Sequence, residues 1–363
     1  MDSGLEGIVA AETVLSHSDG SRGILWVRGR TLAELVADYG YEGAVALLWE
    51  GFAGNGLSPA GMRDALGAGR EAAFARIGEW LGPAANRPLA EGVLLALAHL
   101  PEDSTPAAIG AASPVAIAAL LRSQRGEAPV PPDPALGAAA DFLRMLHGAS
   151  AEAAMVDALD TYWTAVIENG LNASSFTARI IASTRASLVA AVIGAYCAFT
   201  GPLHGGAPGP TLDMLDAVAA SGDIDGWIEE KLSRGERLMG FGHRVFRNGD
   251  PRALALRGAL QRLDPGAGRL AFAAEVEAGV ARVFARLKPG RPPLQPNVEI
   301  NAALLLDAIG IPREAFTPVF AVGRMPGWLA HAMEQRQTGR LIRPSSTYIG
   351  PVPGTGGAHA PAQ

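Results

Sequence analysis

The chain has 363 residues, which is enough for two domains or for one large domain with a substantial buried core. Its 30 basic and 36 acidic residues give a formal net charge of −6 and are spread along the sequence without a basic arm, so we expect no nucleic-acid partner. The single cysteine, Cys197, excludes an intramolecular disulfide, and its apolar surroundings in LVAAVIGAYCAF predict a buried side chain.

The N-terminal stretch MDSGLEGIVAAETVLSHSDG contains no basic segment followed by an apolar core, which predicts a cytoplasmic protein without a secretion signal. Apolar runs such as PVAIAALL are shorter than the roughly 20 residues that a bilayer requires. We therefore expect these runs to be buried helices, and we expect no membrane partner.

The first predicted element is a short strand or hairpin at residues 22–28, where apolar and charged residues alternate between glycines. Downstream, apolar residues recur three and four positions apart, which is typical of helices that pack on a core. Proline- and glycine-rich segments separate these helices, and the segment 125–134 is either a domain linker or a plain loop. The sequence therefore predicts an almost all-α protein, with helices at 31–51, 58–81, 89–100, 113–124, 135–147, 151–170, 173–199, 210–221, 224–234, 251–263, 270–287, 298–309 and 321–338.

His204 lies in the segment GPLHGG, which is too rich in glycine and proline to be a helix interior. Gly205 and Gly206 would let a substrate and backbone N–H groups approach the imidazole. If the next helix starts near residues 209–211, its dipole would lower the pKa of His204 and keep the ring neutral. A neutral imidazole can donate a hydrogen bond to an enolate oxygen, although a structural role is the alternative.

A second glycine-rich segment, GFGHRVFRNGDPR at 240–252, contains His243 and three arginines. Such a cluster is typical of a site that binds anions. The arginines, and Arg244 in particular, are equally well explained as ion-pair partners of Asp250 and nearby acidic residues. A nucleotide-triphosphate site is disfavoured because the segment has neither a Walker motif nor a full dinucleotide fingerprint.

The third segment, PNVEINAALLLDAIGIP at 296–312, places Glu299 in the first turn of a predicted helix. An acidic residue there is favoured by the helix dipole, so a plain capping role is the alternative to catalysis. A metal hydrolase that uses His204, His243 and Glu299 is disfavoured, because the sequence contains no zinc-binding motif with closely spaced histidines.

These three segments, together with GLEGIVAAETVLSHSDG and NASSFTARIIAST, resemble the citrate synthase family in order and spacing over nearly the whole chain. The resemblance implies an all-α, two-domain fold with a short N-terminal β-hairpin: a large domain at 1–206 plus 311–363, and a small domain at 207–310. It also implies a homodimer that condenses acetyl-CoA with oxaloacetate and then hydrolyses citryl-CoA. The coenzyme A thioester is a substrate, and neither a tightly bound cofactor nor a metal is expected.

The resemblance also carries roles for individual residues. His204 would donate to the thioester oxygen, His243 would polarise the ketone of oxaloacetate, and Glu299 would remove the methyl proton. Substrate carboxylates would be held by Asn169, Arg252, Arg324 and, from the partner subunit, Arg343. Coenzyme A would meet Arg247 through a phosphate and the backbone of Leu238, Met239 and Gly240 through its adenine.

Two positions depart from the family pattern. The usual base is aspartate, where this chain has Glu299, and the extra methylene could shift the carboxylate by about 1 Å. A substrate-binding histidine is usual where this chain has Asn169, which cannot become cationic. Asn169 motivates one alternative, a weakly active paralogue that binds coenzyme A or a dicarboxylate. The other is a 2-methylcitrate synthase that uses propionyl-CoA, which the sequence cannot distinguish from a citrate synthase.

Overall fold

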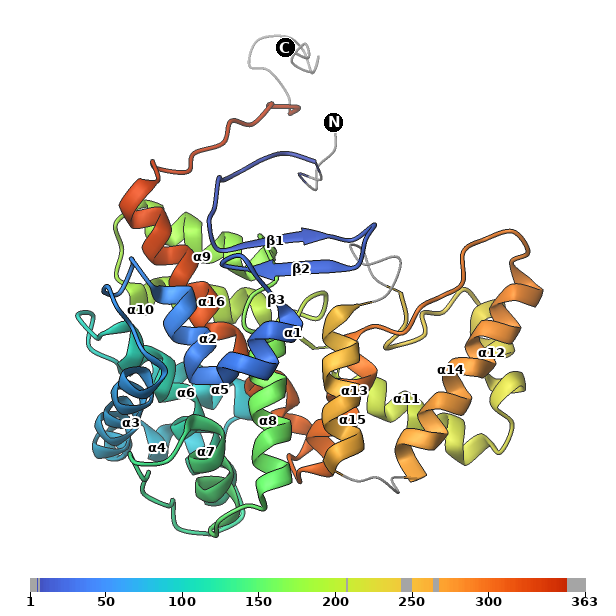
Figure 1. Cartoon of the computed structure of the whole chain (residues 1–363), viewed down its shortest axis with the longest axis horizontal. Helices are drawn as coiled ribbons and strands as arrows, with labels where there is room; N and C mark the ends of the chain where they lie inside the picture. Colours follow the sequence, from blue (N-terminus) through green and yellow to red (C-terminus); the bar gives the residue numbers. More distant parts are fainter. Residues whose placement is uncertain (1–4, 6, 207, 243–249, 264–267, 351–363) are drawn as a thin grey trace.

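A computed structural model of the chain describes residues 5, 7–206, 208–242, 250–263 and 268–350. Over these residues the chain is mainly helical, which confirms the predicted fold class (Figure 1). A π-helical turn (Leu35–Tyr39) joins α1 to α2, and a 3-10 turn (Arg313–Ala315) precedes α16. The α-helices are α1 (Leu32–Glu34), α2 (Gly40–Trp49), α3 (Pro59–Ala75), α4 (Ile77–Ala85), α5 (Leu89–Ala98), α6 (Pro106–Gln124), α7 (Ala138–His147), α8 (Ala153–Val166), α9 (Ala173–Ser183), α10 (Leu188–Phe199), α11 (Pro208–Ser221), α12 (Ile224–Ser233), α13 (Pro251–Leu263), α14 (Gly268–Leu287), α15 (Val298–Ala308) and α16 (Phe316–Thr338).

The N-terminal strands form an antiparallel sheet in the order β1 (Ser16–Asp19), β2 (Ile24–Val27) and β3 (Arg30–Thr31). The predicted segment 22–28 contains β2, which pairs with β1 just before it, with Ser16 opposite Val27; β1 lies outside the predicted range. The sequence did not predict β3, because two residues are too few to show an alternating pattern.

Two long predicted helices are interrupted by a residue with positive φ, a conformation that a right-handed helix cannot continue. Gly40, with φ 62°, separates the π-helical turn from the rest of α2 within the predicted helix 31–51. Arg185, with φ 69°, lies between α9 and α10 within the predicted helix 173–199. This second break determines where α9 ends.

Helix α16 lies at the centre of the protein and is buried along most of its length. Its interior proline, Pro326, has no N–H to donate to the carbonyl of Val322 four residues earlier. The hydroxyl of Tyr41 on α2 donates to that carbonyl instead, at 3.3 Å. A side chain from α2 therefore replaces the backbone hydrogen bond that Pro326 cannot make.

Helices α11 to α15 lie together on one side of the molecule, where α13 and α15 pack against α8 of the larger body (Figure 1). The segment with His204 precedes α11, and Glu299 is in the first turn of α15. Arg324 lies in α16. The boundary between the two groups of helices therefore carries the residues that the sequence singled out.

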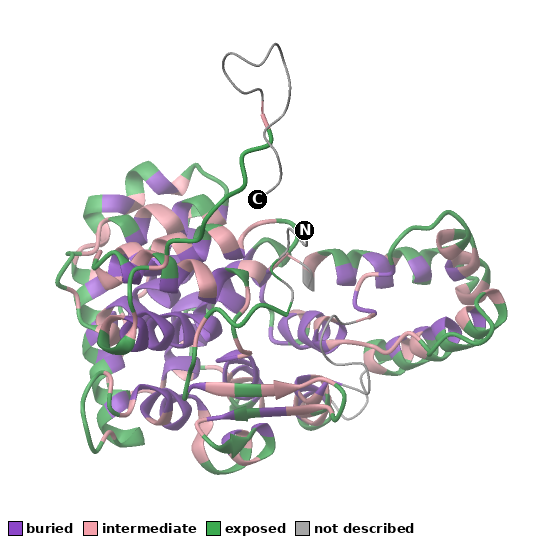
Figure 2. Ribbon diagram, turned by 90° about the horizontal axis from the view of Figure 1, so that it is seen from above, coloured by how far each residue is buried: buried purple, intermediate pink, exposed green. Residues whose placement is uncertain are grey.

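Among the described residues, α6 is long and apolar enough to cross a membrane by length and composition. Because α6 begins at Pro106, its apolar run is longer than the predicted 113–124 segment. However, 72% of its most apolar window is buried inside the protein, as in a core helix. Figure 2 shows buried residues concentrated in the helices of the larger body.

The prediction for Cys197 is wrong. Its side chain is exposed on α10, although Tyr196 and Phe199 on the same helix are buried. The helix is apolar almost throughout, so its composition alone does not reveal which face is covered.

Candidate active site

The imidazole of His204 faces the first turn of α9. The backbone N–H of Ser174 donates to its Nε2 at 3.3 Å, and the hydroxyl of Ser174 lies 2.8 Å from the same nitrogen. An N–H can donate only to an unprotonated ring nitrogen, so the hydrogen bonds assign the ring proton to Nδ1. His204 therefore keeps Nδ1–H as a donor for another group.

Ser174 is itself fixed on two other sides. Its hydroxyl accepts from the indole N–H of Trp328 at 3.0 Å and lies within donating distance, 2.8 Å, of the Asn172 side-chain oxygen. Asn172 is the N-cap of α9 and also accepts from the N–H of Ser175. The orientation of His204 is thus set by a capped helix end and by a side chain of α16.

Burial, and then the positive charge of Arg324, lower the pKa of His204 to about 4. The ring is therefore neutral at pH 7, as predicted, but for a different reason. The helix N-terminus that contacts the imidazole is that of α9, through Ser174, and not that of the following helix α11.

The two glycines after His204 differ in role. A Cβ on Gly205 would lie 2.4 Å from a ring carbon of Phe199, whose ring packs edge-on against His204 at 5.0 Å between centroids. Gly205 therefore makes room for a packing contact rather than for a substrate, which corrects the expectation. A Cβ on Gly206 would meet nothing within 4 Å, consistent with open access.

Glu299 does not cap its helix. The N-cap of α15 is Asn297, whose side-chain oxygen accepts from the Glu299 N–H at 2.9 Å. The carboxyl oxygen Oε2 of Glu299 is buried and has no hydrogen-bond partner in the described part of the chain. Burial raises its pKa to about 7; Asp250 also raises it, whereas Arg252 and Arg324 lower it. Such a carboxylate is poised to exchange a proton near neutral pH.

Two buried arginines lie near Glu299. Arg252 is 3% exposed and makes a two-pronged ion pair with Asp250, at 2.9 and 2.7 Å. Arg324 is 2% exposed, donates to the carbonyl of Val166 at 2.6 Å, and has its pKa lowered by burial to about 10. Because Arg324 influences the pKa of both His204 and Glu299, the structure brings these predicted residues into one region.

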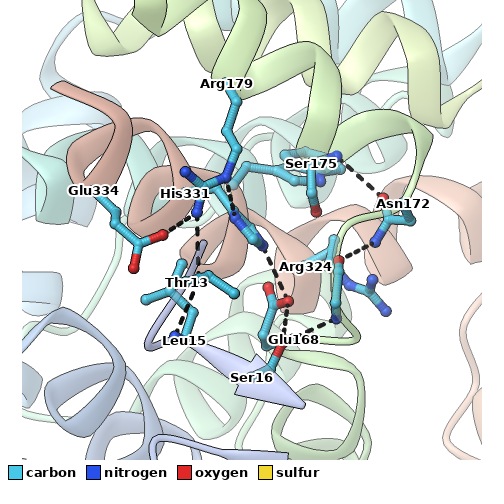
Figure 3. A network of polar contacts seen from close by, with 12 residues as sticks. Thr13, Leu15, Ser16, Glu168, Asn172, Ser175, Arg179, Arg324, His331 and Glu334 are labelled. Atoms are coloured by element: carbon cyan, nitrogen blue, oxygen red, sulfur yellow. Dashed lines mark hydrogen bonds and ion pairs between the residues drawn. The ribbon is translucent and has the colours of Figure 1, made fainter. Parts of the chain in front are cut away.

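Asn169 lies in the loop between α8 and α9, and its Oδ1 is buried without a hydrogen-bond partner among the residues described. One oxygen of the adjacent Glu168, Oε1, accepts from His331 Nε2 at 3.1 Å and from the Ser16 hydroxyl at 3.0 Å (Figure 3). The same hydroxyl accepts from the N–H of Gly170 at 3.1 Å. The loop that presents Asn169 is therefore tied to β1 and α16.

His331 continues this network deeper into the protein (Figure 3). Its Nδ1 accepts from Arg179 Nε at 2.8 Å, so its ring proton is on Nε2, and Arg179 also pairs with Glu334. Burial would raise the pKa of Glu168, but His331, Arg324 and the Ser16 hydroxyl lower it overall. Glu168 therefore stays ionised beside the site.

The predicted coenzyme A segment borders a pocket of about 390 Å³. The buried Leu238 lines this pocket, while Met239 is half-buried beside it. Gly240 has φ 79°, and its carbonyl accepts from the N–H of Asn297 at 2.9 Å. The other lining residues are Leu232, Glu236, Arg237, Phe241, Gly242 and Leu294.

Asn297 links this segment to Glu299. Its side-chain amide donates to the carbonyl of Gly242 at 2.9 Å while its oxygen caps α15. The predicted residues His243, Arg244 and Arg247 lie outside the described residues. Arg343 is exposed on an extended segment that runs away from the helices after α16, so one chain alone does not bring it to the others (Figure 1).

The family model described as Citrate synthase, C-terminal domain matches residues 4–345 of this chain. The chain belongs to the citrate synthase family. Its family places it among condensing transferases. Two relatives from Mycobacterium tuberculosis cover 96% of the chain: "Putative citrate synthase 2", 38% identical over 93% of its own length, and "2-methylcitrate synthase", 32% identical over 90%.

Solved structures agree with the family assignment. Citrate synthase from Thermotoga maritima is 28% identical, with a TM-score of 0.86 over 99% of this chain and 98% of its own. A ternary complex of Thermoplasma acidophilum citrate synthase with carboxymethyl coenzyme A and oxaloacetate is 22% identical, with a TM-score of 0.84 over 97% of each chain, which shows a shared fold.

The sequence reasoning missed the contacts of two residues of this candidate site, Ser174 and Asn297. Each lies at a helix N-terminus beside a predicted catalytic residue. The asparagines that precede α9 and α15 were visible as capping signals. What the sequence could not reveal is that the α9 terminus meets His204, which is 30 residues away.

Proposed function

We propose that this protein is an acyltransferase that condenses acetyl-CoA with oxaloacetate and hydrolyses the product, releasing citrate and coenzyme A. The observation that carries the proposal is the combination of a neutral His204, whose proton is held on Nδ1, with Glu299, a buried carboxyl group whose pKa is near 7. The bound compounds of the Thermoplasma acidophilum neighbour support the same substrates.

The first step is proton removal from the thioester methyl group, which is a weak carbon acid. Glu299 takes the proton, and the Nδ1–H of His204 donates to the thioester oxygen as it gains negative charge. A neutral donor suits this role because it stabilises the enolate without first having to lose a proton.

The enolate carbon then bonds to the ketone carbon of oxaloacetate, while His243 donates to the ketone oxygen as it becomes a hydroxyl. Water finally attacks the thioester carbonyl, and coenzyme A leaves as the thiol. Arg252 and Arg324 suit the carboxylates of oxaloacetate, because a guanidinium pairs with a carboxylate through two parallel hydrogen bonds. Asn169 and the partner subunit's Arg343 complete this set in a homodimer.

Coenzyme A would occupy the pocket beside Leu238, with Met239 and Gly240 near its adenine and Arg247 at a phosphate. A volume of about 390 Å³ falls within the usual range for small-molecule sites. The carbonyls of Gly240 and Gly242 are already bonded to Asn297, so this segment and the base Glu299 would move as one unit.

We further propose that residues 207–310 form a small domain that closes on the large domain, 1–206 plus 311–363, when oxaloacetate binds. Closure would exclude water during condensation. Small-angle scattering with and without oxaloacetate tests this, and identical scattering curves would refute it.

The test of function is release of coenzyme A, followed with DTNB in the presence of oxaloacetate. Glu299→Gln should abolish turnover, because the amide cannot accept the proton. Glu299→Asp should retain the reaction but lower kcat, since a shift of about 1 Å can cost on the order of 100-fold. Absence of coenzyme A release by the unmodified protein, with oxaloacetate still bound, would instead favour the weakly active paralogue.

A second candidate function is 2-methylcitrate synthesis from propionyl-CoA, which the 32% identical relative favours. One added methyl group in an apolar pocket changes transition-state binding by only about 1–3 kcal/mol. The ratio of kcat/KM for acetyl-CoA and propionyl-CoA therefore decides between the two substrates.

A further inference from the structure

Tyr162 on α8 is a fully buried tyrosine whose hydroxyl has no hydrogen-bond partner in the part of the chain that the structure describes. A buried polar atom without a partner is costly, so it needs a physical explanation. Neither the motifs of the sequence nor the proposed mechanism uses this residue.

The position of Tyr162 is set by its packing. Its ring lies against Phe320, with centroids 6.1 Å apart, and the guanidinium of Arg324 lies 5.5 Å from the centroid of the same phenylalanine. The carbonyl that accepts from Arg324 belongs to Val166, one helical turn beyond Tyr162 on α8. Tyr162 and Arg324 are therefore held by the same two elements.

The charges that act on the hydroxyl are those of the candidate site. Burial and then Glu299 raise the pKa of Tyr162 well above its usual range, while Arg324 and Arg252 oppose the rise. The phenol is thus a permanent neutral donor in a region that holds two buried cations. An oxygen of a dicarboxylate is the complementary acceptor there.

We propose that the Tyr162 hydroxyl binds substrate: it donates a hydrogen bond to an oxygen of the bound 2-oxo dicarboxylate, beside Arg252 and Arg324. This inference rests on the proposed function.

The test uses Tyr162→Phe, which removes the hydroxyl and keeps the ring against Phe320. Loss of a hydrogen bond to a charged acceptor should raise the KM for oxaloacetate about 10- to 100-fold and leave the KM for acetyl-CoA unchanged. The melting temperature of the ligand-free protein should stay the same or rise, because the hydroxyl has no partner to lose.

Tyr41→Phe is the matched control. The Tyr41 hydroxyl is also buried, but it donates to the carbonyl of Val322. Its removal should lower the melting temperature and leave the KM for oxaloacetate unchanged. The two variants should therefore show opposite patterns of stability and substrate binding.

An unchanged KM for oxaloacetate in active Tyr162→Phe would overturn the inference and leave the proposed function intact. A lower kcat with a shifted pH profile and an unchanged KM would also overturn it, because the hydroxyl would then act through Glu299. If the unmodified protein shows no turnover, the proposed function fails by itself. The inference is then tested by the rise in melting temperature with oxaloacetate, which should be smaller in Tyr162→Phe; equal shifts, or none, would refute it.

Discussion

Replacing Glu299 by glutamine should abolish activity and stabilise the protein at the same time. The substitution keeps the size of the side chain and removes its charge. The pKa of Glu299 is about 7 in the folded protein, mainly because of burial, against an ordinary value of 4.5. The folded protein therefore holds this proton more tightly than the unfolded chain does.

The sign and size of the effect follow from that difference. The stabilising contribution of the protonated carboxyl group is fully present below pH 4.5 and is lost as the pH rises through 7. A difference of 2.5 pKa units corresponds to about 3 kcal/mol. Above pH 7, the free energy of unfolding of Glu299→Gln should therefore exceed that of the unmodified protein by about 3 kcal/mol. For a chain of this length, this corresponds to a rise of roughly 4 °C in melting temperature.

Thermal unfolding of both proteins between pH 4.5 and 8.5 measures the effect. Their melting temperatures should coincide at the acidic end and separate as the pH rises through 7. In the unmodified protein, kcat/KM for acetyl-CoA should fall tenfold per unit below pH 7, because only the ionised carboxylate accepts a proton. A pH-independent difference in melting temperature, or a flat rate profile from pH 5.5 to 8, would refute the reasoning.

Three further substitutions probe the rest of the site. Asn169→His should lower the KM for oxaloacetate about 10-fold or more, by restoring a charged donor; an unchanged KM would show that this position does not contact the substrate. Ser174→Ala should lower kcat, because His204 loses a neighbouring hydroxyl. It should also cost about 1–3 kcal/mol of stability, because the Trp328 indole N–H loses its acceptor; unchanged thermal unfolding would contradict this. Gly240→Ala should cost about 1–3 kcal/mol and raise the KM for acetyl-CoA, since φ is 79° and the new Cβ would lie 2.4 Å from an α15 side chain; calorimetry and coenzyme A release measure both.

The sequence predicted the helices well, because their apolar periodicity is a local property that survives in the fold. The sequence-based prediction failed where a single residue determines where a helix ends or which side chain is exposed. Arg185 ends α9 with a positive φ, and the sign of this break in the sequence is Ser187, the N-cap of α10, which the predicted helix 173–199 ran through. Cys197 is exposed because the uncovered face of α10 is itself apolar.

The sequence predicted His204, its neutral state and Glu299, but not the tautomer of His204 or the raised pKa of Glu299. Glycine-flanked histidines and an acidic residue at a helix start identified His204 and Glu299. The Nδ1–H tautomer of His204 depends on Ser174 and the raised pKa of Glu299 depends on burial, and both are tertiary effects. A sequence contains the groups that titrate, but only the fold determines what surrounds them.

Three of the seven buried side-chain polar atoms without a partner in the described chain belong to proposed substrate-binding or catalytic residues: the hydroxyl of Tyr162, Oδ1 of Asn169 and Oε2 of Glu299. Each costs about 1–3 kcal/mol in a ligand-free protein, so together they oppose folding by an amount comparable to a large part of its net stability. In the neighbouring network, Oε1 of Glu168 and both ring nitrogens of His331 are hydrogen-bonded to groups on β1, α9 and α16, although Oε2 of Glu168 also lacks a partner in the described chain. A scaffold fixed in this way can hold unsatisfied groups in place until a ligand supplies their partners, and this accounts for polar atoms that remain unpaired inside an otherwise well-packed core.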